Sequence, residues 1–319
     1  FSSSIKGGGI MAYSQWRDVT KKNPCPICGK PDWCSTNGIF VCCRRGDGGG
    51  IERQDKSGGT YWLYRVDSGG IDYSPKEAEF LEPPPSKDSN RASPDILHKV
   101  YSNFLDMLSL SEAHKENLLQ RGLSESEIKL RKYRTLPLMG RSKIARELGR
   151  RYGDDIYHVP GFYLKEGDNG KPYLTYAGRP GILIPVRNLD GKIIGFKIRA
   201  DNPGESESKY IWFSSNGRPG GTGAANSLHY PLFDGSKSII RITEGELKAD
   251  ISTALSGIWT WSLPGVNSWR LVLPALDEVK PEKVIVAFDS DCWENRNVAS
   301  HLLAFMENLQ SRQLGGETG

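Results

Sequence analysis

Three acidic residues in the last third of the chain have the types and spacing of a catalytic metal site. Glu244 is followed by Gly245 at the end of one apolar run, and Asp289 and Asp291 end another. Residues two apart in an extended segment point to the same face, so the two aspartates can bind the same metal ion. Carboxylate oxygens suit Mg²⁺ or Mn²⁺, and such ions support phosphoryl transfer. The plain alternative is that these are ordinary polar residues at strand ends.

Five cysteines between Cys25 and Cys43 form a second chemically active cluster. Cys25 and Cys28 make a CxxC knuckle, Cys34 follows, and Cys42 and Cys43 are adjacent. Structural zinc takes four ligands in a tetrahedron. We predict that Cys25, Cys28, Cys34 and Cys42 bind Zn²⁺, with Cys43 as the alternative fourth ligand.

Aromatic and basic residues accompany these cysteines. Trp33 and Phe40 are candidates for stacking on bases, and Arg44 and Arg45 for holding phosphates. The alternative is that zinc only folds a small module that has too little core of its own.

The stretch from 129 to 151 is strongly basic and contains a single acid, Glu147. Its nine basic residues are Lys129, Arg131, Lys132, Arg134, Arg141, Lys143, Arg146, Arg150 and Arg151. Such a density of cations attracts phosphates through counterion release. We predict that Arg146, Arg150 and Arg151 contact nucleic acid, and the alternative is a solvated basic helix face.

Composition divides the chain into four segments that must position these residues. Residues 11–66 hold the cysteines, many glycines and short apolar runs, which favour a small β module. Residues 67–94 are rich in Pro, Ser and Gly and are expected to form a flexible linker. Helical spacing of apolar residues begins after Ser93-Pro94, a plausible helix cap, and residues 95–235 are expected to combine helices with strands.

Residues 236–312 alternate strand and helix, which predicts a parallel sheet. Strands are expected at 238–243, 258–261 and 283–288, and helices at 246–255, 268–278 and 294–312. Ligand sites in such sheets lie at the carboxyl ends of the strands, where Glu244 and Asp289 are placed. Glu246 and Asp250, on the first of these helices, are expected on a solvated face, with metal ligation as the alternative.

Net charge is only +4, so the distribution of charge is more informative than its sum. No apolar run approaches the ~18–20 residues of a membrane span, and no signal peptide is visible. We therefore expect no membrane partner and a cytoplasmic location, in a bacterial host or phage-infected cell. Met11 is expected to be the start of the fold, with the preceding residues outside it.

The sequences ITEGELKADIS and VIVAFDSD resemble the TOPRIM fold of primases, topoisomerases and some nucleases. This resemblance implies that Glu244, Asp289 and Asp291 hold the catalytic metal. Replicative primases often carry another acid four residues after the metal-binding Glu, where this chain has Lys248. A lysine at this position can contact a phosphate instead of holding a second metal ion. The sequence LPGVNSWR resembles a plasmid- and phage-borne primase subgroup.

The sequence GILIPVRNLDGKIIGFKIRA, followed by SKY, resembles the core that precedes TOPRIM in bacterial and phage replicative primases. That resemblance covers residues 95–310 and the cysteine module. It implies that Arg199 and Lys209 line the path of template and nucleotide. The implied architecture is multidomain α+β and α/β: an N-terminal zinc ribbon, a mixed subdomain at 95–235 and a TOPRIM sheet at 236–312.

The predicted function is that of a DNA primase, which joins NTPs into a short RNA primer on a single-stranded DNA template. Zn²⁺ would be structural, and Mg²⁺ or Mn²⁺ catalytic. A TOPRIM nuclease and a non-catalytic zinc-dependent nucleic-acid adaptor are the alternatives. No GxxxxGK[ST] motif occurs, so a partner helicase would act in trans or lie beyond the glycine-rich segment at 315–319.

Overall fold

The computed structural model divides into two compact units, Phe1–Ser86 and Lys87–Gly319. The residues it describes are 16–38, 40–45, 50–54, 60–65, 91–168, 170–204, 207–289, 296–314 and 316–318. The predicted linker lies outside them except for its last four residues, and Pro94 already begins a helix. Among the described residues, no helix is both long enough and apolar enough to cross a membrane.

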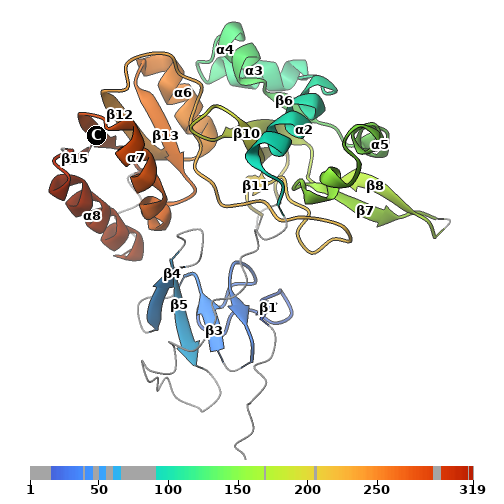
Figure 1. Ribbon diagram of the computed structural model, residues 1–319, viewed down its shortest axis with the longest axis horizontal. Helices are drawn as coiled ribbons and strands as arrows, with labels where there is room; N and C mark the ends of the chain where they lie inside the picture. The colour runs from blue at the N-terminus through green and yellow to red at the C-terminus, as the bar shows by residue number, and fades with distance from the viewer. Residues whose placement is uncertain are drawn as a thin grey trace, which may run out of the picture. The chain divides into compact units, whose positions relative to one another are not determined.

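The first unit contains a small antiparallel sheet (Figure 1). Its strands are β1 (Arg17–Asp18), β2 (Ser35–Thr36), β3 (Phe40–Cys43), β4 (Ile51–Gln54) and β5 (Thr60–Arg65). They lie in the order β1-β2-β3-β5-β4, and each pairing is antiparallel. The four residues of β3 are all buried, so this strand separates two small clusters of side chains.

Helices open the second unit: α2 (Pro94–Asp106), α3 (Glu112–Gln120), α4 (Glu125–Arg131) and α5 (Arg141–Tyr152). The first three begin after serines, and the predicted cap at Ser93-Pro94 is confirmed for α2. The hydroxyls of Ser93, Ser111 and Ser124 each accept a hydrogen bond from the N–H three residues later, as helix N-caps do. Pro94 then occupies a first-turn position that requires no N–H donor.

A mixed region of antiparallel strands packs against these helices. Four strands, β6 (Arg134–Leu136), β9 (Gly181–Arg187), β10 (Ile193–Ala200) and β11 (Tyr210–Trp212), lie in the order β11-β10-β9-β6. Strands β9 and β10 form an antiparallel hairpin, and at its turn the Lys192 N–H donates to the Asn188 side-chain oxygen at 2.9 Å. Phe104 of α2 packs against Phe196 and Phe213 in the core between helix and sheet.

A separate hairpin of β7 (Phe162–Glu166) and β8 (Pro172–Tyr176) follows the short 3₁₀ helix η1 (Gly153–His158). Helix α5 lies beside this hairpin, on the side of the unit away from α8 (Figure 1). The approach is close at Gly149, where an added Cβ would lie 2.8 Å from Leu174 Cδ2. Glycine at this helical position therefore lets α5 pack tightly on β8.

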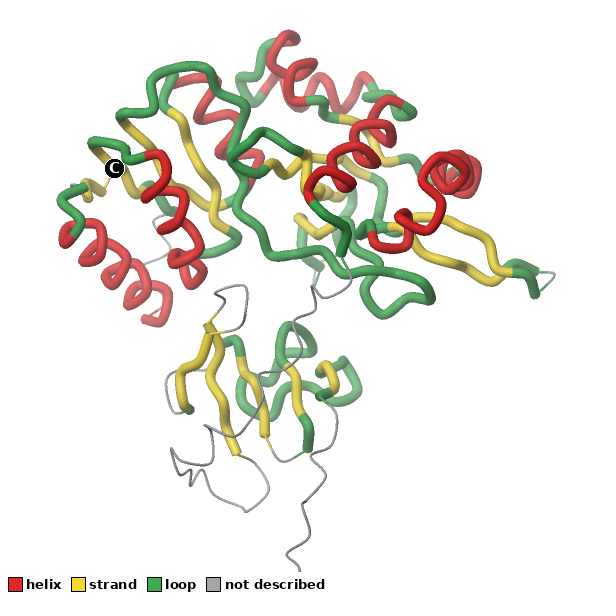
Figure 2. Tube along the Cα trace, viewed as in Figure 1, coloured by secondary structure: helices red, strands yellow, loops and turns green. Residues whose placement is uncertain are grey.

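The C-terminal part contains a parallel sheet in the order β13-β12-β14-β15. Figure 2 shows its strands in yellow with helices in red beside them. Its strands are β12 (Ile239–Glu244), β13 (Trp259–Leu263), β14 (Lys283–Val286) and β15 (Gly316–Thr318). Its helices are α6 (Glu246–Ser256), η2 (Val266–Val272), α7 (Leu273–Val279) and α8 (Arg296–Ser311). The predicted parallel arrangement is confirmed. The predicted helix at 268–278 is a 3₁₀ turn followed by α7, which has a proline in its first turn.

A buried ionic cluster fastens α6 to the mixed region. Asp250 is 2% exposed, so the expected solvated position is wrong. Its carboxylate accepts hydrogen bonds from Arg131 at 3.0 Å and from the Tyr133 hydroxyl. His229 Nε2 lies 3.3 Å from the same carboxylate, and its Nδ1 accepts the Arg187 backbone N–H, so Nε2 carries the donated proton. Burial alone would raise the pKa of Asp250, but His229 and Arg131 outweigh burial and lower it.

Candidate metal centres and nucleic-acid-binding surfaces

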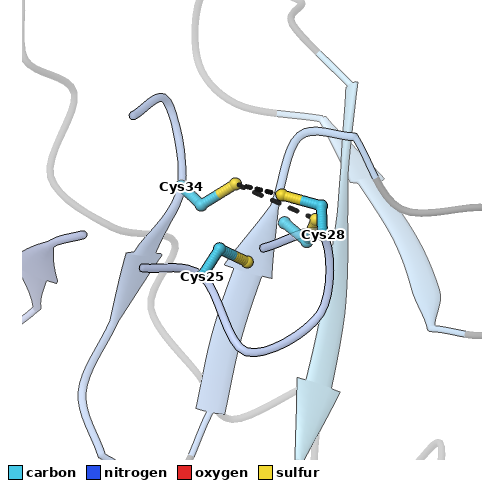
Figure 3. Close-up of side chains that lie close together, drawn as sticks. Cys25, Cys28 and Cys34 are labelled. Carbon is cyan, nitrogen blue, oxygen red and sulfur yellow. Dashed lines mark hydrogen bonds between the residues drawn. The ribbon is translucent and has the colours of Figure 1, made fainter. Parts of the chain in front are cut away.

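Four cysteine sulfurs meet in the first unit. The Sγ atoms of Cys25, Cys28, Cys34 and Cys43 all lie within 4.8 Å of one another, and Figure 3 shows the labelled side chains converging. Cys34 Sγ is 3.7 Å from Cys28 Sγ and 3.8 Å from Cys43 Sγ. Thiolates bound tetrahedrally to zinc at ~2.3 Å would be separated by about 3.8 Å. The cluster is therefore compatible with structural zinc, and its cysteines are free thiols.

The predicted fourth ligand, Cys42, is replaced in this cluster by Cys43. Successive residues of a strand point to opposite faces. Cys43 therefore lies with Cys25 and Cys34, whereas Cys42 packs with Phe40 in the cluster on the other face of β3.

Trp33 is the exposed aromatic residue next to the cysteine cluster. Its side chain is 51% exposed, and the Arg45 guanidinium lies 5.0 Å from its ring centroid. Arg45 is held there by an ion pair of 2.8 Å with Asp32. Arg44 lies over the ring of Tyr61. Phe40 is 3% exposed, so its expected stacking on a base is wrong.

Glu244 and Asp289 lie at the carboxyl edge of the parallel sheet. Strands β12 and β14 are adjacent, with Ile242 opposite Val286, and the Ala287 N–H donates to the Ile242 carbonyl at 2.8 Å. Glu244 ends β12, and Asp289 follows β14 by three residues. Gly245, at φ 81°, makes the turn into α6 that disfavours other residues. The third predicted ligand, Asp291, lies outside the described residues.

Lys248 brings a positive charge to this edge. It lies in the first turn of α6, and its ammonium group forms an ion pair with Asp289. The side chains of Lys248 and Asp289 are 42% and 63% exposed, so both remain accessible to a ligand. Lys248, which stands where replicative primases often carry an acid, therefore contacts Asp289, one of the predicted metal ligands.

A cationic and aromatic surface lies on β10 and β11. Arg199 is paired in register with Tyr210, and Lys197 with Trp212. The Lys197 ammonium is 4.2 Å from the Trp212 ring centroid and 3.9 Å from a Glu246 carboxylate oxygen, and burial lowers its pKa. The Lys209 carbonyl accepts the Ala200 N–H, so the backbone of Lys209 lies beside the end of β10.

The pair of Lys197 and Glu246 was missed in the sequence. Glu246 is 3% exposed, so its expected solvated position is wrong. Because Glu246 follows Gly245, the pair connects the Arg199 face of β10 to the beginning of α6. The sequence signal for this cationic face was the spacing of Lys197 and Arg199, two residues apart along one strand.

The basic stretch at 129–151 is not one surface. Arg131 is buried against Asp250, and Arg134 and Arg141 donate to backbone carbonyls. The remaining cations of α5 are Lys143, Arg146, Arg150 and Arg151. The last two lie 3.5 Å and 3.8 Å from Glu147 carboxylate oxygens. Only part of the predicted cluster is thus available to an anion.

Comparison with known proteins finds similarity in structure rather than in sequence. No protein-family profile matches the chain, and no curated protein sequence matches it. The crystal structure of the Aquifex aeolicus primase zinc-binding and RNA polymerase domains is similar, with a TM-score of 0.50 and 16% identity. That match covers 71% of this chain and 55% of the A. aeolicus chain, so this chain spans about half of its length.

Other similar structures are also primase domains. The RNA polymerase domain of Mycobacterium tuberculosis primase DnaG has a TM-score of 0.47 and 14% identity, covering 71% of this chain and 74% of that one. The E. coli primase catalytic core has a TM-score of 0.43 and 17% identity, covering 68% and 67%. The fold of this chain is thus similar to that of the zinc-binding and RNA polymerase domains of the A. aeolicus primase.

Proposed function

We propose that this chain is a DNA primase that synthesises short RNA primers on single-stranded DNA. The observation that carries the proposal is the position of Glu244 and Asp289. Glu244 ends β12 and Asp289 follows β14, the adjacent parallel strand, in a fold similar to primase zinc-binding and RNA polymerase domains. Ligand sites of open α/β sheets lie at this edge.

In this proposal, Glu244, Asp289 and Asp291 hold Mg²⁺ or Mn²⁺, as the TOPRIM resemblance implies. When bound, the ion would stabilise the charge that develops during nucleotidyl transfer. Lys248 keeps a positive charge beside Asp289 and is accessible, so it is suited to bind a phosphate of the incoming NTP. The exposed carboxylate of Asp289 supports its role as a ligand that a nucleotide can reach.

Arg199 and Lys209 supply cations for the template and NTP path. Trp212 and Tyr210 lie beside them on β11 and offer ring faces to bases. The product of such a site is an RNA primer paired to the template. A helicase in cis or in trans, and a plasmid- or phage-borne origin, remain parts of the proposal that rest on the sequence resemblance alone.

In the first unit, Cys25, Cys28, Cys34 and Cys43 would hold Zn²⁺ and fix the segment that carries Trp33. The exposed Trp33 ring and the cation of Arg45 beside it form a surface suited to single-stranded template, and Arg44 is proposed as a further phosphate contact. Arg146, Arg150 and Arg151 of α5 are proposed as further template contacts.

The test is to incubate the chain with single-stranded DNA, Mg²⁺ and labelled NTPs and to analyse the products by size. Short RNA that disappears on chelation and in the Asp289→Asn variant supports the proposal. Degraded DNA without RNA would replace it with the TOPRIM nuclease alternative. Binding of DNA without either product would favour the zinc-dependent adaptor.

A further inference from the structure

Helix α6 begins directly after the Glu244-Gly245 turn, so it is a ready source of further metal ligands at this edge of the sheet. Its acidic residues are Glu246 and Asp250. Both are almost fully buried, at 3% and 2% exposure, and both have cationic partners. The Glu246 carboxylate lies 3.9 Å from the Lys197 ammonium. The Asp250 carboxylate lies 3.0 Å from the Arg131 guanidinium. Neither carboxylate is therefore presented to an ion in solvent.

Lys248, which lies between these two acids on α6, carries the opposite charge and is exposed. Its ammonium group forms an ion pair with Asp289, one of the acids that the proposed function assigns to the metal. An ammonium in contact with a carboxylate occupies a position at which a metal ion would bind, and it repels any other cation brought close to it. The one accessible charge in the first turn of α6 is thus a cation held against the site.

The formal charges at this edge suit one divalent ion rather than two. The ligands in the proposed function are Glu244, Asp289 and Asp291, which together carry three negative charges. One divalent ion and the Lys248 ammonium balance these three charges. A second divalent ion would leave the site with an excess of two positive charges, which no further carboxylate of α6 offsets. Mg²⁺ itself is commonly bound by only one or two carboxylates together with substrate phosphates.

We propose that the protein binds a single divalent ion at this edge and that the Lys248 ammonium takes the place of a second one. In two-metal sites the ions lie ~3.5–4 Å apart and stabilise the attacking and leaving oxygens together. Here one of the two positive charges belongs permanently to the chain. The inference rests on the proposed function, because it takes Glu244, Asp289 and Asp291 as the ligands of the ion.

The bound ions are counted without any reaction, by titrating the zinc-loaded full chain with Mn²⁺ and following the electron paramagnetic resonance of the free ion. Only ions whose binding is lost in Asp289→Asn are counted. The unmodified chain should bind one such ion. Lys248→Asp should bind two, and their signals should show spin coupling because the ions would be ~4 Å apart. An acid in the first turn favours a helix, so this variant should keep its melting temperature.

Matched variants separate this role from general charge. The exposed Lys280 precedes β14 by three residues, whereas Asp289 follows β14 by three, so Lys280→Asp makes the same change of charge at the opposite end of the strand. It should still bind one ion. Lys248→Gln removes the ammonium without adding a ligand and should bind one ion about two- to fivefold more tightly, as for a lost exposed charge interaction. The same variant should bind NTPs more weakly, and a purely structural lysine would not shift the two affinities in opposite directions.

Two spin-coupled ions in the unmodified chain would overturn the inference, as would a single ion in Lys248→Asp or a second ion in Lys280→Asp. If the unmodified chain binds two ions and synthesises RNA, the inference fails and the proposed function stands. If the three chains bind one, two and one ions as expected but no RNA is made, the inference stands and the proposed function fails. The absence of any ion that depends on Asp289 would overturn both.

Discussion

The cysteine cluster and the acidic edge of the parallel sheet are both predicted metal sites, but they are built differently. Cys25, Cys34 and Cys43 are at most 1% exposed and are themselves part of the core of their unit. Asp289 is 63% exposed, and the sheet that carries it has an apolar core containing Trp261 and Phe305. We therefore expect the cysteine cluster to determine the folding of its unit, whereas the acidic edge should determine only activity.

The largest expected effect is loss of the zinc site. Metal analysis should find about one zinc per chain, and Cys43→Ser should lose it together with the fold of the first unit, because zinc contributes ~10–16 kcal/mol in zinc-finger peptides. Cys42→Ser is the matched control and should keep the metal. Zinc retained by Cys43→Ser and lost by Cys42→Ser would show that β3 directs Cys42, and not Cys43, toward the other cysteines.

In either cysteine variant, the second unit should remain folded. Its thermal unfolding should be unchanged, because the described residues of its two main cores include no cysteine. Simultaneous loss of both units would break the comparison, since the metal would then support the whole chain.

A smaller but still large effect is expected at the buried ionic cluster. Arg131→Met leaves Asp250 without its cation and should destabilise the second unit by about 3–5 kcal/mol, measured by denaturant unfolding. Arg131→Met combined with Asp250→Leu should recover part of this loss, because the carboxylate that lost its ion-pair partner is then removed as well. If the single variant is as stable as the unmodified chain, the cluster does not fasten α6.

The same cluster predicts a dependence of stability on pH. The pKa of Asp250 is lowered in the folded state, so its contribution is present above the ordinary carboxylate pKa and is lost as pH falls through the folded value. Acid unfolding of Asp250→Asn should therefore show a weaker pH dependence than that of the unmodified chain. An identical pH dependence would contradict the lowered pKa.

The smallest effect is expected at Lys248. Its ion pair with Asp289 is exposed, and such pairs contribute little to stability. Lys248→Gln should leave the melting temperature unchanged but raise the KM for NTPs about tenfold if the ammonium binds a phosphate. A variant with unchanged KM would make Lys248 a surface residue with no part in substrate binding.

Local signals in the sequence predicted much of the fold. The Ser93-Pro94 cap indicated where α2 begins, and apolar runs followed by acids indicated the strands β12 and β14. The sequence could not show which of Cys42 and Cys43 joins the other cysteines. Two adjacent cysteines point to opposite faces of β3, and nothing in their pattern tells which face packs against Cys25 and Cys28. The strand β15 was missed because its Gly-Glu-Thr sequence has no apolar residue.

Burial of charged residues was the other failure. Arg131 and Asp250 lie on different helices, 119 residues apart, and meet only in the folded chain. Their burial depends on this long-range pairing, to which local periodicity is insensitive. The same holds for Lys197 and Glu246, whose contact joins β10 to α6.

Primer synthesis by Asp289→Asn tests the central account most directly. The substitution preserves the shape of the side chain and removes its charge, so the melting temperature should not fall. Synthesis of short RNA on single-stranded DNA with Mg²⁺ should drop at least about 100-fold, as for other lost electrostatic contacts to a transition state. Glu244→Gln should behave in the same way, and both variants should still bind the DNA. Undiminished synthesis by either folded variant would contradict the assignment of this sheet edge as the catalytic metal site.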